Sequence, residues 1–344
     1  MVKDILAYRC HAISDDIGSI TLDTVSIEDP GPGEVQINVK ACSVNFPDLL
    51  MIQGKYQFKP PLPFAPGGEA SGDVVAIGSE VSQVKEGDRV VFGSRHGCFA
   101  ETLNVSAEAV NPIPGSMTYA KAAAYGTAYQ TAYVALTHRG NLRRGEWLMV
   151  HGATGGVGLA AVDLGKYLGA SVIGTGGTDA KLAVVKARGA DEVINYTQAD
   201  GSLGGFRDRV KSITGTGGAD VIYDPVGGDV FDESMRCINW GGRILTIGFT
   251  SGRWPQAAVN LILIKQIAVI GVRAGEVGRR DPQLGRKFHR ELYRLADDGL
   301  IDPYVCAGFP LERAVDAMRM LENREVVGKC VVTMNGYELE TPDA

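Results

Sequence analysis

The sequence lacks any two cysteines at the spacing of a metal site or a redox motif. Its six cysteines stand singly, at positions 10, 42, 98, 237, 306 and 330, which is typical of a reduced, cytoplasmic protein. Long apolar runs are also missing, because the most apolar stretch, residues 261–264, is interrupted by Lys265 and is far too short to cross a bilayer. The first residues contain no apolar signal-peptide core. We therefore expect a cytoplasmic protein with no membrane partner.

An excess of basic charge is absent as well. The 344 residues carry a formal net charge of −6, which argues against nucleic acid as a partner. With 45% hydrophobic and 22% charged residues, the chain has the composition of a soluble globular protein and a length that suits two domains.

The stretch from Trp147 to Gly169 predicts a phosphate-binding turn. An apolar run at 148–150 suits a buried parallel strand, glycines follow at 152–158, and the apolar spacing then becomes helical. Such a turn lets backbone N–H groups approach an anion at a helix N-terminus. The dinucleotide pattern Gly-x-Gly-x-x-Gly is imperfect here, since Ala153 holds its first position, and glycine turns also serve only to reverse a chain.

An alternation of strands and helices surrounds this turn. Further strands are predicted at 171–175, 191–196, 219–225, 242–249 and 267–272, with a helix at 178–189. This order predicts an α/β fold with a doubly wound parallel sheet. Residues 1 to about 120 instead show short strands between turns, typical of a partly β-barrel domain. The tail predicts a helix near 284–299, a loop at 301–309, a helix at 311–323 and a strand at 329–333.

Several motifs occur in an order specific to one family. They include Asn45-Phe-Pro-Asp48, Gly54-Lys-Tyr56, Pro66-Gly-Gly-Glu-Ala-Ser-Gly72, Gly87-Asp-Arg-Val90, Gly126-Thr-Ala-Tyr129 and Gly189-Ala-Asp-Glu-Val-Ile-Asn-Tyr196. With these motifs the chain resembles the zinc-free quinone oxidoreductase branch of the medium-chain dehydrogenase/reductase (MDR) superfamily. The resemblance implies a GroES-like catalytic domain at 1–124 and 274–344, and a Rossmann NADP(H)-binding domain at 125–273.

Zinc-dependent relatives carry Cys and His where this chain has Asn45 and Gly68. A catalytic zinc needs about three Cys, His or carboxylate ligands. Because Asp48 and Glu69 alone do not meet that need, we expect no metal site.

The end of the second Rossmann strand indicates which nicotinamide binds. An NAD-specific fold usually has an acidic residue there to accept the ribose hydroxyls, whereas this strand ends in Thr175-Gly176-Gly177. Lys181 and Tyr196 match the NADPH-binding pattern of the family, so NADP(H) is the predicted cofactor. The alternative is that Lys181 is a solvated helix lysine and Tyr196 a half-buried strand end.

The resemblance also implies individual site residues. The predicted cofactor-binding residues are Asn45, Thr127, Gly155, Gly156, Val157, Gly176, Lys181, Tyr196, Gly248, Phe249, Arg273 and Lys329. Arg273 departs from the apolar or aromatic residue that relatives often have. The candidate catalytic residues are Asn45, Tyr56 and Asp48, where Tyr56 is equally a packing tyrosine.

Metal-free hydride transfer from NADPH to a quinone is the predicted function, with a small-molecule electron acceptor as partner. Two alternatives stay open: an NADPH-dependent reductase of enone or enoyl-thioester double bonds, and a low-turnover NADPH-binding structural or regulatory protein. The apolar last strand at 267–272 predicts pairing with a second copy, hence a homodimer.

Overall fold

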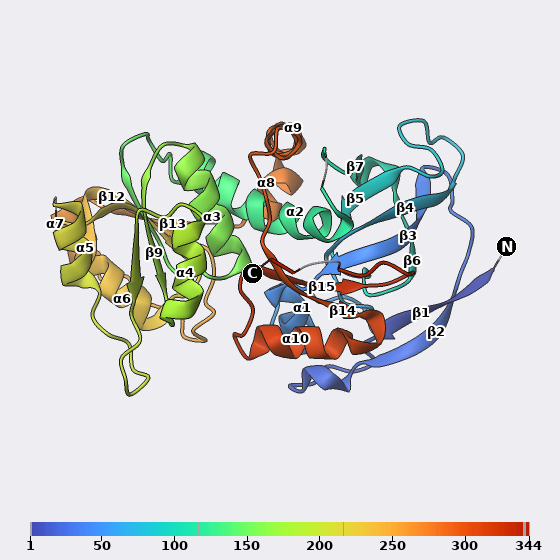
Figure 1. Cartoon of the computed structure of the whole chain (residues 1–344), viewed down its shortest axis with the longest axis horizontal. Coiled ribbons are helices and arrows are strands. Elements are labelled where there is room, and N and C mark those ends of the chain that lie inside the picture. The colour runs from blue at the N-terminus through green and yellow to red at the C-terminus, as the bar shows by residue number, and fades with distance from the viewer. Residues whose placement is uncertain (1, 116, 216, 340–341, 344) are drawn as a thin grey trace. The chain divides into compact units, whose positions relative to one another are not determined.

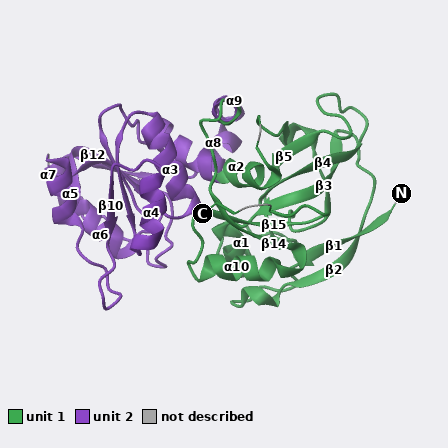
Figure 2. Ribbon diagram, in the orientation of Figure 1, with its two compact units in different colours: residues 1–127, 296–344 green, residues 128–295 purple. Residues whose placement is uncertain are grey.

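The protein is described by a computed structural model covering residues 2–115, 117–215, 217–339 and 342–343 (Figure 1). The chain forms two compact units (Figure 2). Unit 1 comprises residues 1–127 and 296–344, and unit 2 comprises residues 128–295. Among the described residues, no helix is long and apolar enough to cross a membrane.

Unit 1 contains two sheets. A two-stranded antiparallel sheet pairs β1 (Lys3–Arg9) with β2 (Thr21–Ile27). The larger sheet has the order β14-β15-β3-β4-β5-β7, and β6 pairs with β3. Its strands are β3 (Glu34–Ser43), β4 (Glu69–Ile77), β5 (Arg89–Gly93), β6 (Thr102–Ser106), β7 (Val110–Pro112), β14 (Val305–Pro310) and β15 (Lys329–Thr333).

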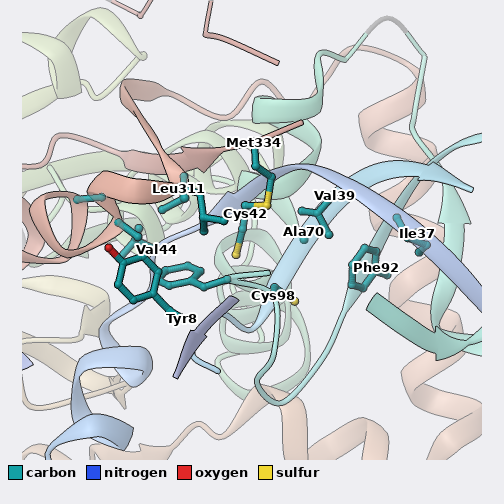
Figure 3. Packing of buried hydrophobic residues seen from close by; sticks show 14 of the residues in the cluster. Tyr8, Ile37, Val39, Cys42, Val44, Ala70, Phe92, Cys98, Leu311 and Met334 are labelled. Carbon is teal, nitrogen blue, oxygen red and sulfur yellow. The ribbon is translucent and has the colours of Figure 1, made fainter. Parts of the chain in front are cut away.

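The strands of unit 1 enclose an apolar core. Alternate residues of β3, among them Val35, Ile37 and Val39, are fully buried, as the two-residue period of a strand with one covered face requires. Figure 3 shows members of the core from distant segments, including Cys42 of β3, Cys98 and Met334. The helical elements of this unit are η1 (Ile17–Ser19), α1 (Phe46–Ile52), η2 (Ala107–Ala109), η4 (Leu311–Arg313) and α10 (Ala314–Glu322).

Unit 2 contains a six-stranded parallel sheet with the order β10-β9-β8-β11-β12-β13. Its strands are β8 (Trp147–Val150), β9 (Ser171–Gly176), β10 (Glu192–Asn195), β11 (Ala219–Asp224), β12 (Ile238–Thr246) and β13 (Ala268–Gly271). In chain order this is 3-2-1-4-5-6, the order of a Rossmann fold. The predicted α/β fold with a doubly wound sheet is therefore confirmed.

Helices flank the sheet of unit 2, and Figure 1 shows α3 and α4 on one side of it and α5 and α6 on the other. They are α3 (Gly156–Tyr167), α4 (Asp179–Ala187), α5 (Arg207–Thr214), α6 (Gly228–Cys237), α7 (Val259–Lys265) and α8 (Ala274–Arg280), with a π-helical segment, η3 (Val134–Arg139). Two further helices, α2 (Tyr119–Tyr133) and α9 (Pro282–Asp297), run through the points where the units divide.

The division into units differs from the predicted domains at residues 125–127 and 274–295. The sequence placed 274–344 with the flanking domain, but residues 274–295 belong to unit 2. The reason is packing, because Ala274 and Phe288 are buried in one apolar cluster with Val134. Residues 301–309, predicted as a loop, include most of β14.

Candidate functional site

The predicted phosphate-binding turn connects β8 to α3 in unit 2. Gly152 has a φ of +54°, a conformation that favours glycine. A Cβ at Gly158 would lie 2.2 Å from the carbonyl oxygen of Gly152, so only glycine lets the helix approach the turn so closely. Gly155 is the N-cap residue of α3 and supplies no capping side chain. The first N–H groups of α3 are thus left for an anion, which the helix dipole also favours.

The loops that follow β11 and β12 meet at the same edge of this sheet. Ile247 donates its N–H to the carbonyl of Asp224 (2.8 Å), and Thr250 donates to that of Pro225 (3.1 Å). These bonds place Gly248 and Phe249 beside Pro225, and Phe249 is 41% exposed. The carboxyl ends of β8 and β11 are neighbours at the point where the strand order reverses, which is where such sheets bind ligands.

Asp224 holds the loop after β11 in place. Its Oδ1 accepts the N–H groups of Val226 (2.8 Å) and Gly227 (2.9 Å). Its Oδ2 is buried and has no hydrogen-bond partner among the described residues. Burial raises the pKa of this carboxyl to about 6, so close to neutral pH it can release its proton.

The end of β9 carries the residues predicted to select the cofactor. Tyr196 donates its N–H to the carbonyl of Gly176 (3.1 Å), which fixes the tyrosine next to the end of β9. Lys181 lies in the first turn of α4. The nearby carboxylate of Asp179 accepts a hydrogen bond from Asn195 Nδ2 (3.1 Å). The carboxylate of Asp179, the acidic group of this segment, thus already has a hydrogen-bond partner.

Unit 1 contains a polar cluster formed by Asn45, Asp48, Glu69 and Lys329, which we call the Asn45 cluster; Asn45 is half-buried and the other three are buried. Lys329 Nζ donates to Asn45 Oδ1 (2.6 Å), to Glu69 Oε1 (3.2 Å) and to the carbonyl of Val44 (3.3 Å). The other carboxylate oxygen of Glu69 accepts the N–H of Thr127 (2.7 Å). Three of the predicted residues, Asn45, Asp48 and Lys329, and the backbone of a fourth, Thr127, therefore come together.

Local structure explains how Asp48 enters this cluster. Asn45 precedes α1, and Asp48 stands in its first turn, where it accepts the N–H of Asn45 (2.8 Å) with Oδ2. Its Oδ1 accepts the N–H of Gly67 (3.2 Å). Burial raises the pKa of Asp48 to about 7, although these bonds and the charge of Lys329 act to lower it.

The amide of Asn45 is held in one orientation. Because ammonium only donates, its oxygen must face Lys329, and its nitrogen then donates to Glu69 Oε1 (2.9 Å). The same nitrogen, Nδ2, also donates to the carbonyl oxygen of Ser43 over a longer distance of 3.4 Å. The cluster is therefore a fixed scaffold, whose donors are already used within it.

The donors of this cluster do not match a zinc site. Among the described residues, no group of three or more His, Cys, Asp or Glu side chains is placed to hold a metal ion. The ammonium of Lys329 already contacts both Asn45 and Glu69, and its charge would repel a second cation there.

Two predicted residues, Tyr56 and Arg273, form no hydrogen bond or ion pair with the side chains of the Asn45 cluster in the described part of the chain. Tyr56 follows α1, and its ring packs against the apolar core of unit 1. Its hydroxyl has no hydrogen bond with a described residue. Arg273 precedes α8, is exposed, and lies 3.6 Å from Glu276 Oε2.

The sequence predicted no role for Glu69, which it named only as one of two carboxylates too few to bind zinc. Its role as the partner of Lys329 depends on a contact across 260 residues. The available signal was a charged residue at the start of a strand whose next residues are small and buried.

Two family models match parts of the chain. Residues 31–115 match the family described as alcohol dehydrogenase GroES-like domain, and residues 156–288 match the family described as zinc-binding dehydrogenase. Quinone oxidoreductase-like protein 2 homolog of Nematostella vectensis is 38% identical over 96% of this chain and 89% of its own length.

Solved structures are similar over nearly the whole chain. The quinone oxidoreductase of Escherichia coli, solved as a complex with NADPH, is 30% identical with a TM-score of 0.84 and covers 96% of this chain and 100% of its own. The JamJ enoyl reductase is 26% identical with a TM-score of 0.83, covering 97% and 100%.

Proposed function

Since this chain belongs to the zinc-free quinone oxidoreductase branch of the MDR superfamily, we propose that it transfers hydride from NADPH to a quinone without a metal. The family makes it an oxidoreductase that uses a nicotinamide cofactor. The observation that supports the proposal most directly is the glycine turn between β8 and α3, with an uncapped helix N-terminus at the switch point of the sheet. Gly155, Gly156 and Val157 are the proposed diphosphate contacts.

NADPH is proposed over NADH because of the end of β9. A 2′-phosphate there meets Gly176 and Gly177 rather than a carboxylate. Lys181 supplies a cation and Tyr196 a hydroxyl donor, and Asp179 is already bonded to Asn195. Gly248 and Phe249 are proposed contacts at the nicotinamide end, and by the resemblance Asn45, Thr127, Lys329 and Arg273 remain proposed cofactor contacts.

The bound cofactor supplies the hydride, so the side chains have to bind, orient and stabilise charge. Three of the four residues of the Asn45 cluster are buried, and its side-chain donors already have hydrogen-bond acceptors, which suits a rigid wall that keeps water from the reaction. As hydride reaches a quinone, negative charge develops on its carbonyl oxygen. Tyr56 is our proposed donor to that oxygen, since its ring is held by the core while its hydroxyl bonds to no described residue. Asp48 is proposed to adjust the charge of the cluster, because its pKa is about 7.

A steady-state assay tests this function. Purified protein should oxidise NADPH, followed by absorbance, when small ortho- or para-quinones are added. Inert quinones together with turnover of activated enals or enoyl thioesters would instead support the double-bond reductase, which the similarity to JamJ enoyl reductase favours. No turnover with any acceptor would contradict both.

A homodimer is proposed from the surface of unit 2. β13 ends the strand order of its sheet, and its outer residues are exposed. Large apolar side chains of this unit also face solvent, namely Trp240, Trp254, Val259, Leu263 and Ile264. An uncovered strand and an exposed apolar surface favour pairing with another copy.

A further inference from the structure

The guanidinium of an arginine lies over an aromatic ring in unit 1. The guanidinium carbon of Arg95 lies 3.5 Å from the ring centroid of Phe58. Phe58 in turn stacks on His96, with centroids 6.0 Å apart and an interplanar angle of 21°. Phe64 meets His96 edge to face, also at 6.0 Å. We call these four residues the Arg95 platform.

The backbone segment that carries Arg95 begins next to the Asn45 cluster. Gly93, at the end of β5, pairs with Glu69 of that cluster. From there the chain turns, and Ser94 donates its N–H to the carbonyl of Gly68 (2.9 Å). Arg95 therefore stands two residues beyond the position opposite Glu69. Phe58 lies on the segment that follows α1, and Asn45 and Asp48 begin that helix.

The charge of Arg95 is not compensated. The residue is exposed, and no carboxylate of the described residues lies within ion-pair distance of it. Two other exposed basic residues, by contrast, form ion pairs. Lys55 pairs with Asp15 (2.8 Å), and Arg253 pairs with Asp229 (2.7 Å) and Asp232. Burial and the neighbouring Arg95 lower the pKa of His96, which disfavours a second positive charge beside Arg95. One positive charge is thus fixed on an aromatic face.

Such an arrangement is suited to one kind of ligand. Packing on a ring restricts the freedom of an arginine side chain, and an exposed guanidinium keeps its N–H groups available to a ligand. Those edges match a carboxylate or phosphate in a two-bond geometry. Phe58 and His96 are partly exposed, so a planar group bound beside the anion would meet the aromatic edges of the platform. The buried Nδ1 of His96 has no hydrogen-bond partner among the described residues.

We propose that Arg95 selects an acceptor that carries an anionic group beside its planar, reducible part. This inference rests on the proposed function for the identity of the reaction, but the anion-binding role of Arg95 is separate from turnover. Binding of the anionic group by Arg95 would favour such an acceptor over a neutral quinone.

Two measurements test the proposal on the holoenzyme. The first compares kcat/KM for 9,10-phenanthrenequinone and its 2-carboxylate. Arg95→Gln should lower kcat/KM for the carboxylate roughly tenfold and leave the neutral quinone within about twofold. Arg95→Lys, which keeps the charge but not the fork, should fall between. Lys55→Gln, which removes a charge already paired with Asp15, is the matched control and should change neither value.

The second measurement does not need turnover. Calorimetry on protein saturated with NADP⁺ compares phenanthrene-2-carboxylate with the uncharged 2-carboxamide. Arg95→Gln should weaken only the carboxylate, again roughly tenfold. Equal weakening of both ligands, or of neither, would overturn the proposal. If quinones prove inert while the carboxylate is still lost in Arg95→Gln, the proposed reaction fails and the anion site stands.

Discussion

The ammonium of Lys329 lies 2.6 Å from the amide oxygen of Asn45. Asn45 is the residue that stands where zinc-dependent relatives have a cysteine. The same ammonium contacts Glu69. The cluster therefore contains the buried positive charge of Lys329, and this charge sets the orientation of the Asn45 amide.

Removal of this ammonium should destabilise unit 1 strongly. Lys329→Met leaves Glu69 buried without its counter-charge, and breaking a buried ion pair costs about 3–5 kcal/mol. We expect the free energy of unfolding in urea to fall by that order and kcat/KM to fall with it. Lys329→Arg keeps the charge and should lose less of both. Equal stability of Lys329→Met and the wild type would contradict the structure of the cluster.

Asp48 should make stability depend on pH. Its pKa is raised from 3.8 to about 7, so the folded state holds the proton more tightly than the unfolded state. Its contribution to stability is then fully present below about pH 4 and is lost as the pH rises through 7. The free energy of unfolding of the wild type relative to Asp48→Asn should fall between pH 4 and pH 7. Asp15→Asn, at an exposed carboxylate whose pKa is lowered by Lys55, should show no such fall; a flat wild-type difference would refute the prediction.

Lys181 should distinguish the two nicotinamides. Loss of a charge-assisted hydrogen bond to the 2′-phosphate costs about 1.5–3 kcal/mol, so Lys181→Ala should raise the KM for NADPH roughly 10- to 100-fold. The KM for NADH, which has no 2′-phosphate, should change little. Lys181→Arg should retain most of the preference. If both KM values rise together, Lys181 has a structural role instead.

Gly158 should tolerate no side chain. A methyl group there would lie 2.2 Å from the carbonyl oxygen of Gly152, so Gly158→Ala must displace the turn. We expect the Kd for NADPH, measured by fluorescence, to rise by roughly tenfold or more, as when a charged hydrogen bond is lost. Gly271→Ala is the control, since a Cβ there meets no atom within 4 Å; unchanged NADPH binding by Gly158→Ala would disprove the proposed diphosphate site.

The exposed apolar residues of α7 should hold two copies together. Leu263 and Ile264 are 77% and 68% exposed, and Leu263→Glu with Ile264→Glu should convert a dimer to a monomer in light-scattering measurements. Because neither side chain is in the core, the far-UV spectrum should not change. Val75→Glu, at an exposed apolar residue of β4 in unit 1, is the control. A wild type that is already monomeric would exclude the homodimer.

The parallel sheet was predictable because its signals are local. An apolar run followed by glycines marks β8 and its turn, and β-branched runs mark β9 and β11. Short β14 was missed, since its sequence contains Ala307-Gly308 and its stability depends on pairing with β15 more than 20 residues later. The Ala-rich α2 was missed as well.

The site was predictable in part. The motif residues Asn45, Asp48 and Lys329 do meet, but the resemblance indicated this and their spacing did not. The bond of Lys329 to Glu69 spans 260 residues, and the stacking of Arg95 on Phe58 depends on two loops that no periodicity connects. Long-range pairs of this kind become visible only when the chain is folded.

The position of β15 in its sheet has a consequence for biosynthesis. This strand pairs with both β14 and β3, and Lys329 is translated 285 residues after Val44, whose carbonyl it contacts. On the ribosome the continuous segment 128–295 can fold while unit 1 still lacks β15. A chain that ends after residue 320 and is released from the ribosome should therefore yield a protease-resistant fragment from the middle of the sequence. It should lack oxidoreductase activity, because β15 and Lys329 are missing.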